Sequence, residues 1–331
     1  MPEPFLSETE ELTIGIENFI FHVVHHGGPE PILFDEVPLG EYEGFFLDLI
    51  RATLKGNRFI FAEHSTTKQL LKEVVDEPGR FVPISKQLAA NFHYEQDKRI
   101  KPGALIVVGL NAGDQKFYSM IKYDHERVLT YREEGTRAIL QEIANTFSKS
   151  REALHKSAVV RLDRGEGELV VIDQTVRADI SDFFRTFLGA KRMLSNAQLT
   201  ELVEKVIVET AKAHKDTLPN SITCRIREIA FNVIQNNDTF ESEKVCAQVF
   251  GADGGEKVQK TFDRAVKRLG LEGEKFEYDK NALRKPRKRK LHTKEGVQIQ
   301  YGEDAKETVA INEIDANKTI ITITTAKLTE C

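Results

Sequence analysis

A dense run of positive charge near the C-terminal end offers the clearest chemistry in this sequence. Cations that neutralise phosphates release the counterions condensed on a nucleic acid, so a basic cluster gives affinity that does not depend on base sequence. The alternative is a solvated linker that keeps the chain soluble, although fewer charges would serve that purpose. Because Pro286 opposes a helix, the run is predicted to be an extended arm or loop. The predicted phosphate-binding residues are Arg284, Lys285, Arg287, Lys288, Arg289, Lys290 and Lys294, with no acidic residue among them.

A second basic surface is predicted on a helix over residues 256–269. At about 100° per residue, an apolar stripe of Val258, Phe262, Ala265 and Leu269 lies opposite a stripe of cations. Gln259 is the only residue of a base-reading type here, so the expected contact with DNA is to phosphate. An ordinary solvated face is the competing interpretation. The basic stripe consists of Lys257, Lys260, Arg264, Lys267 and Arg268.

Two smaller clusters could support metal chemistry. His22 and His26 would share one face of a helix, but no acidic residue or cysteine completes a metal site at a suitable spacing, and Gly27-Gly28 opposes the helix. A nuclease would need converging carboxylates for Mg²⁺, and the only dense candidates are Asp163, Glu166, Glu168 and Asp173. The sequence has no phosphate-binding glycine loop and no nucleophile elbow. We therefore expect no catalytic residues, no metal and no cofactor.

The charge is distributed unevenly along the chain. The net charge is −5, yet residues 1–50 hold eleven Asp and Glu and no Lys or Arg. Residues 256–294 hold fourteen Lys and Arg against six Asp and Glu. Such asymmetry suits one region to polyanions and makes another repel them. The acidic region is therefore expected to face away from DNA, where it could contact a partner protein or a second copy in a homodimer.

Composition indicates a cytoplasmic protein without a membrane span. No apolar run approaches the roughly 18 residues that a spanning helix needs. The acidic first residues do not resemble a secretory signal. The three cysteines are far apart and odd in number, so they predict no disulfide framework and fit a reducing compartment.

The first half of the chain is predicted to form an α+β domain. Residues 12–24 form a strand or a buried helix, and helices are predicted over 42–54 and 66–75. Residues 80–175 are interpreted as an antiparallel sheet with strands at 104–110, 117–123, 157–162 and 168–174. A helix near 136–150 is expected as an insertion.

The second half is predicted to be mainly helical. A short helix from Asp179, the expected N-cap, to Gly189, the expected C′ residue, has an apolar face built largely of Phe. Further helices are predicted at 197–214, 221–235, 242–250 and 256–269. Strands at 297–301, 309–314 and 319–325 are expected to make a C-terminal β-hairpin, with a tight turn at 315–318. The predicted class is α+β, with one domain over 1–176 and a second over 177–331.

The short Phe-rich helix carries a family resemblance. Residues 177–190 resemble the signature helix of the 37-kilodalton nucleoid-associated proteins, typically D-F-F-x-x-F-L-G-A, which stands here as Asp182-Phe183-Phe184 followed by Phe187-Leu188-Gly189-Ala190. His22 is similar to a histidine in the first apolar segment of that family. The resemblance implies a non-enzymatic bacterial protein of the cytoplasm and nucleoid that binds DNA. Because members have been linked to topoisomerase function, it also implies a protein partner.

The leading hypothesis is weakly specific binding of double-stranded DNA through the basic run, supported by the helical stripe. The run is denser than the family pattern, so this role comes from its own residues and not from the resemblance. The main alternative is a protein-interaction adaptor, such as a topoisomerase modulator or a phage-response component, whose acidic first 50 residues carry the function. A metal-dependent nuclease is a third hypothesis.

Overall fold

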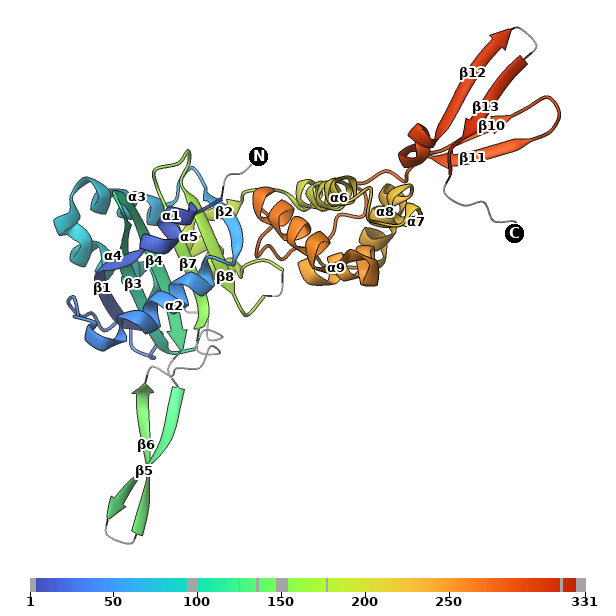
Figure 1. Ribbon diagram of the computed structural model, residues 1–331. Coiled ribbons are helices and arrows are strands. Elements are labelled where there is room, and N and C mark those ends of the chain that lie inside the picture. The colour runs from blue at the N-terminus through green and yellow to red at the C-terminus, as the bar shows by residue number, and fades with distance from the viewer. Residues whose placement is uncertain are drawn as a thin grey trace. The chain divides into compact units, whose positions relative to one another are not determined.

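The protein is seen in a computed structural model that describes residues 4–93, 101–124, 126–134, 137–146, 154–176, 178–315 and 318–325. The chain divides into two compact units (Figure 1). The sheet unit comprises residues 4–194 and 273–275, and the helical unit comprises 195–272 and the chain from 276 onward. The sheet unit therefore includes the Phe-rich helix, whereas the sequence predicts a domain boundary after residue 176.

The sheet unit is built on seven strands whose neighbours all pair antiparallel, in the order β1-β3-β4-β7-β8-β2-β9. The predicted hairpin is present as its longest pair, β3 and β4. β-Branched residues along β3 suit a strand covered on both faces, and β3 is buried at nearly every position. The strands are β1 (Gly15–Val24), β2 (Asn57–Phe61), β3 (Gly103–Ala112), β4 (Gln115–Asp124), β7 (Leu154–Arg161), β8 (Glu168–Asp173) and β9 (Ala190–Arg192).

Helices cover both faces of this sheet. On one face, α3 (Thr66–Asp76), α4 (Phe81–His93) and α5 (Asp182–Leu188) pack their apolar residues against β2, β3 and β4. On the other face, α2 (Glu43–Thr53) buries Phe46 and Ile50, and Phe5 and Leu6 lie beside them, just before the short helix α1 (Glu8–Thr13). The predicted α+β class with an antiparallel sheet is confirmed.

Two predictions for residues 80–175 are wrong. The segment expected to hold strands begins with the helix α4, whose Phe81, Ile84, Leu88 and Phe92 recur at helical spacing and are buried. The helix expected near 136–150 is instead β6 (Arg137–Thr146), which pairs with β5 (Glu126–Glu134). Residues 147–150 lie outside the described part of the chain. Pairing with β5 satisfies the backbone of β6, and tertiary context of this kind overrides a weak helix propensity.

The Phe-rich helix α5 is held by a buried carboxylate. Its N-cap is Ser181 and not the expected Asp179, which pairs with Arg185 at 2.6 Å. Asp173 accepts hydrogen bonds from the Ser181 backbone N–H at 2.9 Å and from its hydroxyl at 2.6 Å. Although burial opposes ionisation, hydrogen bonds from Lys156 and Ser181 hold the pKa of Asp173 below its usual value. Gly189 ends the helix in the left-handed conformation, as predicted.

The segment Gly273–Lys275 returns to the sheet unit after the main helices. Glu274 accepts a hydrogen bond from the Arg58 backbone N–H and forms an ion pair with Arg192, each at 2.7 Å. The Lys275 N–H donates to Asn57 Oδ1 at 2.6 Å. Gly273 has a φ of +74°, and a Cβ there would lie 2.1 Å from the Lys55 carbonyl oxygen. Glycine is therefore required where this segment crosses the end of α2.

The helical unit follows its predicted elements, except that the single helix predicted over 221–235 is divided into two at residues 224–225. It contains α6 (Asn196–Ala213), α7 (Asn220–Thr223), α8 (Ile226–Asn236) and α9 (Ser242–Arg268). α9 is interrupted at Gly251 and Gly255, whose φ angles of 49° and 54° are not helical, so the predicted break is present. Phe250 and Phe262 meet across this kink with ring centroids 6.2 Å apart.

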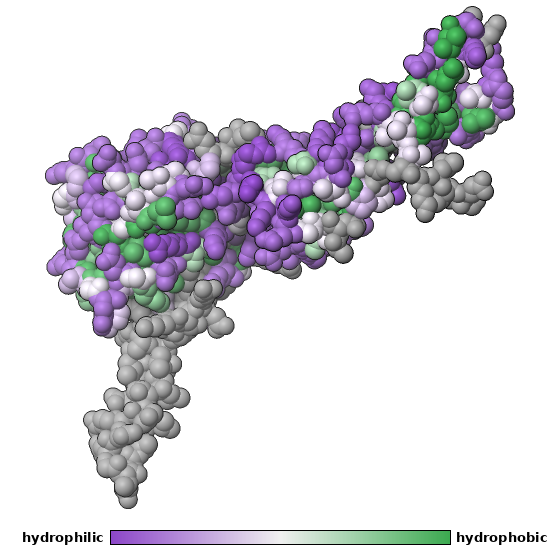
Figure 2. Space-filling model, in the orientation of Figure 1, coloured by the Kyte–Doolittle hydropathy of each residue, from purple (hydrophilic) through white to green (hydrophobic). Residues whose placement is uncertain are grey.

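Two separate β-hairpins end the described chain (Figure 1). In the first, β10 (Lys288–His292) pairs with β11 (Gln298–Gly302). In the second, β12 (Val309–Asp315) pairs with β13 (Lys318–Ile323), and the two central residues of the predicted turn lie outside the described residues. Four of the five isoleucines in the second hairpin are 43–58% exposed and belong to the apolar surface visible in Figure 2. None of the helices in the described ranges is long and apolar enough to cross a membrane.

The two histidines considered as possible metal ligands, His22 and His26, do not lie on a helix. His22 lies in β1 and not on a helix, where it is fully buried. Its Nδ1 accepts the Phe34 N–H at 3.2 Å, and its Nε2 lies 3.2 Å from the Ser85 hydroxyl, which donates to a carbonyl. Burial is the main cause that lowers the pKa of His22 to about 4, followed by Lys86. Burial likewise lowers the pKa of His25 to about 4.

The lowered pKa values of His22 and His25 predict a loss of stability in mild acid. The unfolded chain binds protons at both histidines below about pH 6.5, whereas the folded chain resists them until about pH 4. The free energy of unfolding should therefore fall as the pH falls from about 6.5 to about 4. This decrease adds to the one caused by protonation of carboxylates. Thermal melting of His22→Gln should show a shallower decline than the wild-type chain. Equal slopes for the two proteins would contradict the assignment.

Candidate nucleic-acid interface

The predicted basic run begins as irregular chain and continues into a β-strand. Residues 284–287 lie outside regular structure, and residues 288–290 open β10. Six of its seven cations form no ion pair with any described residue, and Lys288 alone does so. All seven are exposed: Arg284, Lys285, Arg287, Lys288, Arg289, Lys290 and Lys294. The segment thus presents unneutralised charge along an extended backbone.

The β10–β11 hairpin, which we call the basic ribbon, is closed by a short loop. Thr293 N–H donates to the Val297 carbonyl at 2.9 Å, and Gly296 has a φ of 91°. A glycine in this conformation permits the tight return of the chain. Lys294 lies in this loop, next to Glu295. The ribbon therefore carries positive charge from its base to its tip.

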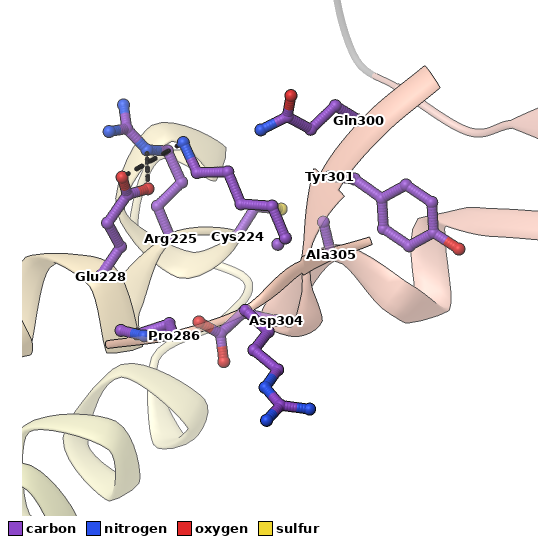
Figure 3. Close-up of a pocket in the computed structure, with 11 residues that line it drawn as sticks. Cys224, Arg225, Glu228, Pro286, Gln300, Tyr301, Asp304 and Ala305 are labelled. Carbon is purple, nitrogen blue, oxygen red and sulfur yellow. Dashed lines mark hydrogen bonds and ion pairs between the residues drawn. The ribbon is translucent and has the colours of Figure 1, made fainter. Parts of the chain in front are cut away.

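The base of the ribbon is joined to α8 by ion pairs around a hollow of about 380 Å³ (Figure 3). Glu228 pairs with Arg225 at 3.1 Å and with Lys288 at 3.3 Å. The hydrogen bond from Arg225 is the main cause that lowers the pKa of Glu228. Lys288 is therefore partly neutralised and helps to position the ribbon.

A second anchor ties the end of β11 to the first turn of α8. Asp304 accepts a hydrogen bond from the Arg227 backbone N–H at 3.0 Å and an ion pair from its guanidinium at 3.3 Å. A carboxylate at a helix N-terminus satisfies a free N–H group and interacts favourably with the helix dipole. Arg227 also pairs with Glu204 at 3.5 Å. Sequence reasoning missed this anchor, because nothing in the local pattern relates Asp304 to residue 227.

Replacing Asp304 with alanine should loosen the ribbon without removing any of its positive charge. We expect a loss of roughly 1 kcal/mol in unfolding free energy, since the hydrogen bond that Asp304 accepts is only partly buried. Hydrogen exchange of the β10 and β11 amides should accelerate. Glu307→Ala provides a matched control, because its partner Lys215 is exposed and such a pair contributes little. Unchanged exchange in Asp304→Ala would contradict the anchoring role.

The basic stripe on the second half of α9 is less available than predicted. Its apolar face is buried at Val258, Phe262, Ala265 and Leu269, as expected. However, Lys260 pairs with Glu256 at 2.5 Å, and Arg268 pairs with Glu209. Lys257 and Arg264 remain exposed without an ion pair to a described residue, and Lys267 is half-buried. The stripe thus offers fewer free cations than the basic ribbon.

The four carboxylates considered for a nuclease do not share one site. Each pairs with a different cation: Asp163 with Arg161, Glu166 with Lys68, Glu168 with Arg58, and Asp173 with Lys156. In the part of the chain that the structure describes, no group of three or more His, Cys, Asp or Glu side chains could hold a metal ion. These acids serve the ion pairing of the sheet unit.

The described geometry defines an α+β protein with a free basic ribbon on a helical unit. A family model described as nucleoid-associated protein YejK matches residues 20–326, so the chain belongs to this family of nucleoid-associated proteins. The match confirms the resemblance of residues 177–190 to the nucleoid-associated proteins, and membership of this family implies a nucleoid-related role. No curated protein matches the chain.

Proposed function

We propose that this protein binds double-stranded DNA through phosphate contacts led by the basic segment Arg284–Lys290 and that it does so without catalysing a reaction. The observation that carries the proposal is a row of exposed cations in which only Lys288 is paired with a described acidic residue, Glu228. Membership of a nucleoid-associated family supports it. Because the sequence-independent phosphate term dominates such contacts, the binding should depend steeply on salt.

The test is a fluorescence-anisotropy titration of a random-sequence duplex of about 30 base pairs at several salt concentrations. If about five or six phosphates are neutralised, the logarithm of the affinity should fall with the logarithm of salt at a slope near −5. Plasmid incubated with Mg²⁺ or Mn²⁺ should remain intact. Absence of binding at about 50 mM salt, or nicking of the plasmid, would overturn the corresponding part of the proposal.

A second candidate function is that of a protein-interaction adaptor that binds its partner through the acidic first 50 residues. Ile32, Leu33 and Phe34 are 38–47% exposed, which suits contact with an apolar protein surface. The neighbouring Asp35 already pairs with Lys86 at 2.6 Å. Deleting residues 1–50 would not test this idea, because β1 and most of α2 belong to the core. Leu33→Ser is the appropriate variant, because it leaves the ion pair between Asp35 and Lys86 intact. It should abolish partner capture while DNA binding persists.

A further inference from the structure

The register of the basic ribbon gathers polar side chains on one of its faces. Lys290 lies opposite Gln300, and His292 lies opposite Gln298. Directly opposite residues of an antiparallel pair project to the same face, as do alternate residues along one strand. All four are exposed. In Figure 3, Gln300 and Tyr301 accordingly leave β11 on opposite sides.

The other face of the ribbon has a different character. Leu291, Ile299 and Tyr301 lie on it and are half-buried. Arg289, opposite Tyr301, also lies on this face and is exposed. The polar face carries Lys288 as well, which pairs with Glu228 at the base of the ribbon, so the part of the polar face that is open to a ligand lies beyond Lys288. Among the described residues, no hydrogen bond or ion pair engages the side chains of Lys290, Gln298 or Gln300. These groups have their donors and acceptors available.

The chemistry of this face fits the edges of base pairs. A glutamine amide can donate and accept at once, which matches N6 and N7 of adenine, and a lysine matches the acceptors of guanine. The major groove admits a two-stranded β-ribbon and presents a distinct pattern for each base pair. Gln298 and Gln300 are two residues apart in an extended strand, roughly 6.8 Å at about 3.4 Å per residue. This distance is close to two base-pair steps of roughly 3.4 Å each.

We propose that the basic ribbon lies in the major groove of double-stranded DNA and reads bases there. Gln298 and Gln300 bind adenines two base-pair steps apart, and Lys290 binds a neighbouring guanine. The irregular segment 284–287, outside the ribbon, holds the phosphates beside the groove. The inference rests on the proposed DNA binding and adds a short sequence preference to it.

The test is selection of preferred sites by the full-length chain from duplexes with a randomised centre, followed by sequencing. We expect enrichment of adenine at two positions two base-pair steps apart. The double variant Gln298→Ala, Gln300→Ala should lose this enrichment. It should still bind random duplex within about twofold of the wild type and with the same salt slope, because phosphate contacts carry that affinity. Asn312→Ala with Thr322→Ala, two exposed residues of the other hairpin, should leave the enrichment intact.

A substitution in the DNA then tests the contact at the level of atoms. Placing 7-deazaadenine in the enriched site removes the N7 acceptor and should weaken wild-type binding by about tenfold, with no effect on the double variant. Duplex binding without enrichment would overturn base reading and leave the proposed function standing. Absence of binding to every duplex would overturn both, and a preference for single-stranded RNA would overturn the inference.

Discussion

Replacing five cations of the basic segment with alanine should weaken binding to random duplex by roughly a thousandfold at low salt. The variant changes Arg284, Lys285, Arg287, Arg289 and Lys290. It spares Lys288, because that side chain pairs with Glu228 at the base of the ribbon and its loss would also disturb the anchor. Each phosphate contact contributes about 0.9 to the salt slope, so the slope should become shallower by about 4 to 5. Anisotropy titration across several salt concentrations measures both quantities.

A control of equal charge separates a local effect from a general one. Removing five exposed lysines elsewhere lowers the net charge by the same amount: Lys55, Lys72, Lys101, Lys191 and Lys212. This control should bind nearly as well as the wild type, since long-range fields between exposed charges are screened within about 10 Å at 0.1 M salt. Equal losses in both variants would show that total charge governs binding and that the basic segment has no special role.

The elements predicted best were those with a single strong pattern. The helices of the second half have clear apolar stripes, Pro219 precedes α7 and glycines interrupt α9, so most of their bounds were close to the observed ones. The division between α7 and α8 has no such breaker residue and was not predicted. The β3–β4 hairpin has a β-branched run in β3 before its turn and an alternating pattern in β4 after it. Local sequence alone was sufficient wherever periodicity and turn residues agreed.

The predictions that were wrong concern features that depend on contacts between residues far apart in the sequence. The strand β6 has a helix-compatible composition, and only its partner β5 selects the extended form. Ser181 rather than Asp179 caps α5, because Asp173, eight residues earlier, holds it there. The face of the basic ribbon that carries Gln298 and Gln300 also depends on strand register. From the sequence alone, nothing shows that these two glutamines share a face with Lys290, because that depends on how β10 and β11 are paired.

Replacing Glu274 with alanine should produce the largest loss of stability that we predict for a single residue. Its side chain is 2% exposed, and it accepts both the Arg58 backbone N–H and the Arg192 guanidinium. Removing one partner of a buried ion pair costs about 3–5 kcal/mol, because the remaining charge stays buried. Among the described residues, Arg192 would keep the Lys275 carbonyl at 2.9 Å, the Ala178 carbonyl at 3.4 Å and the Phe59 ring. Hydrogen exchange of β2 amides should report this loss, since β2 carries Asn57 and Arg58.

Two further variants separate the contribution of the Glu274 charge to stability from that of its hydrogen bond to the Arg58 N–H. Glu274→Gln keeps a hydrogen-bond acceptor for the Arg58 N–H and should cost clearly less than alanine. In a double-mutant cycle, Arg192→Met together with Glu274→Ala should cost less than the sum of the two single changes, because neither then leaves a buried charge unpaired. Strict additivity would mean that the two side chains stabilise the sheet unit independently. A coupling of about 1 kcal/mol or more would show that this ion pair helps to hold the returning segment, beside the hydrogen bonds to Arg58 and Asn57.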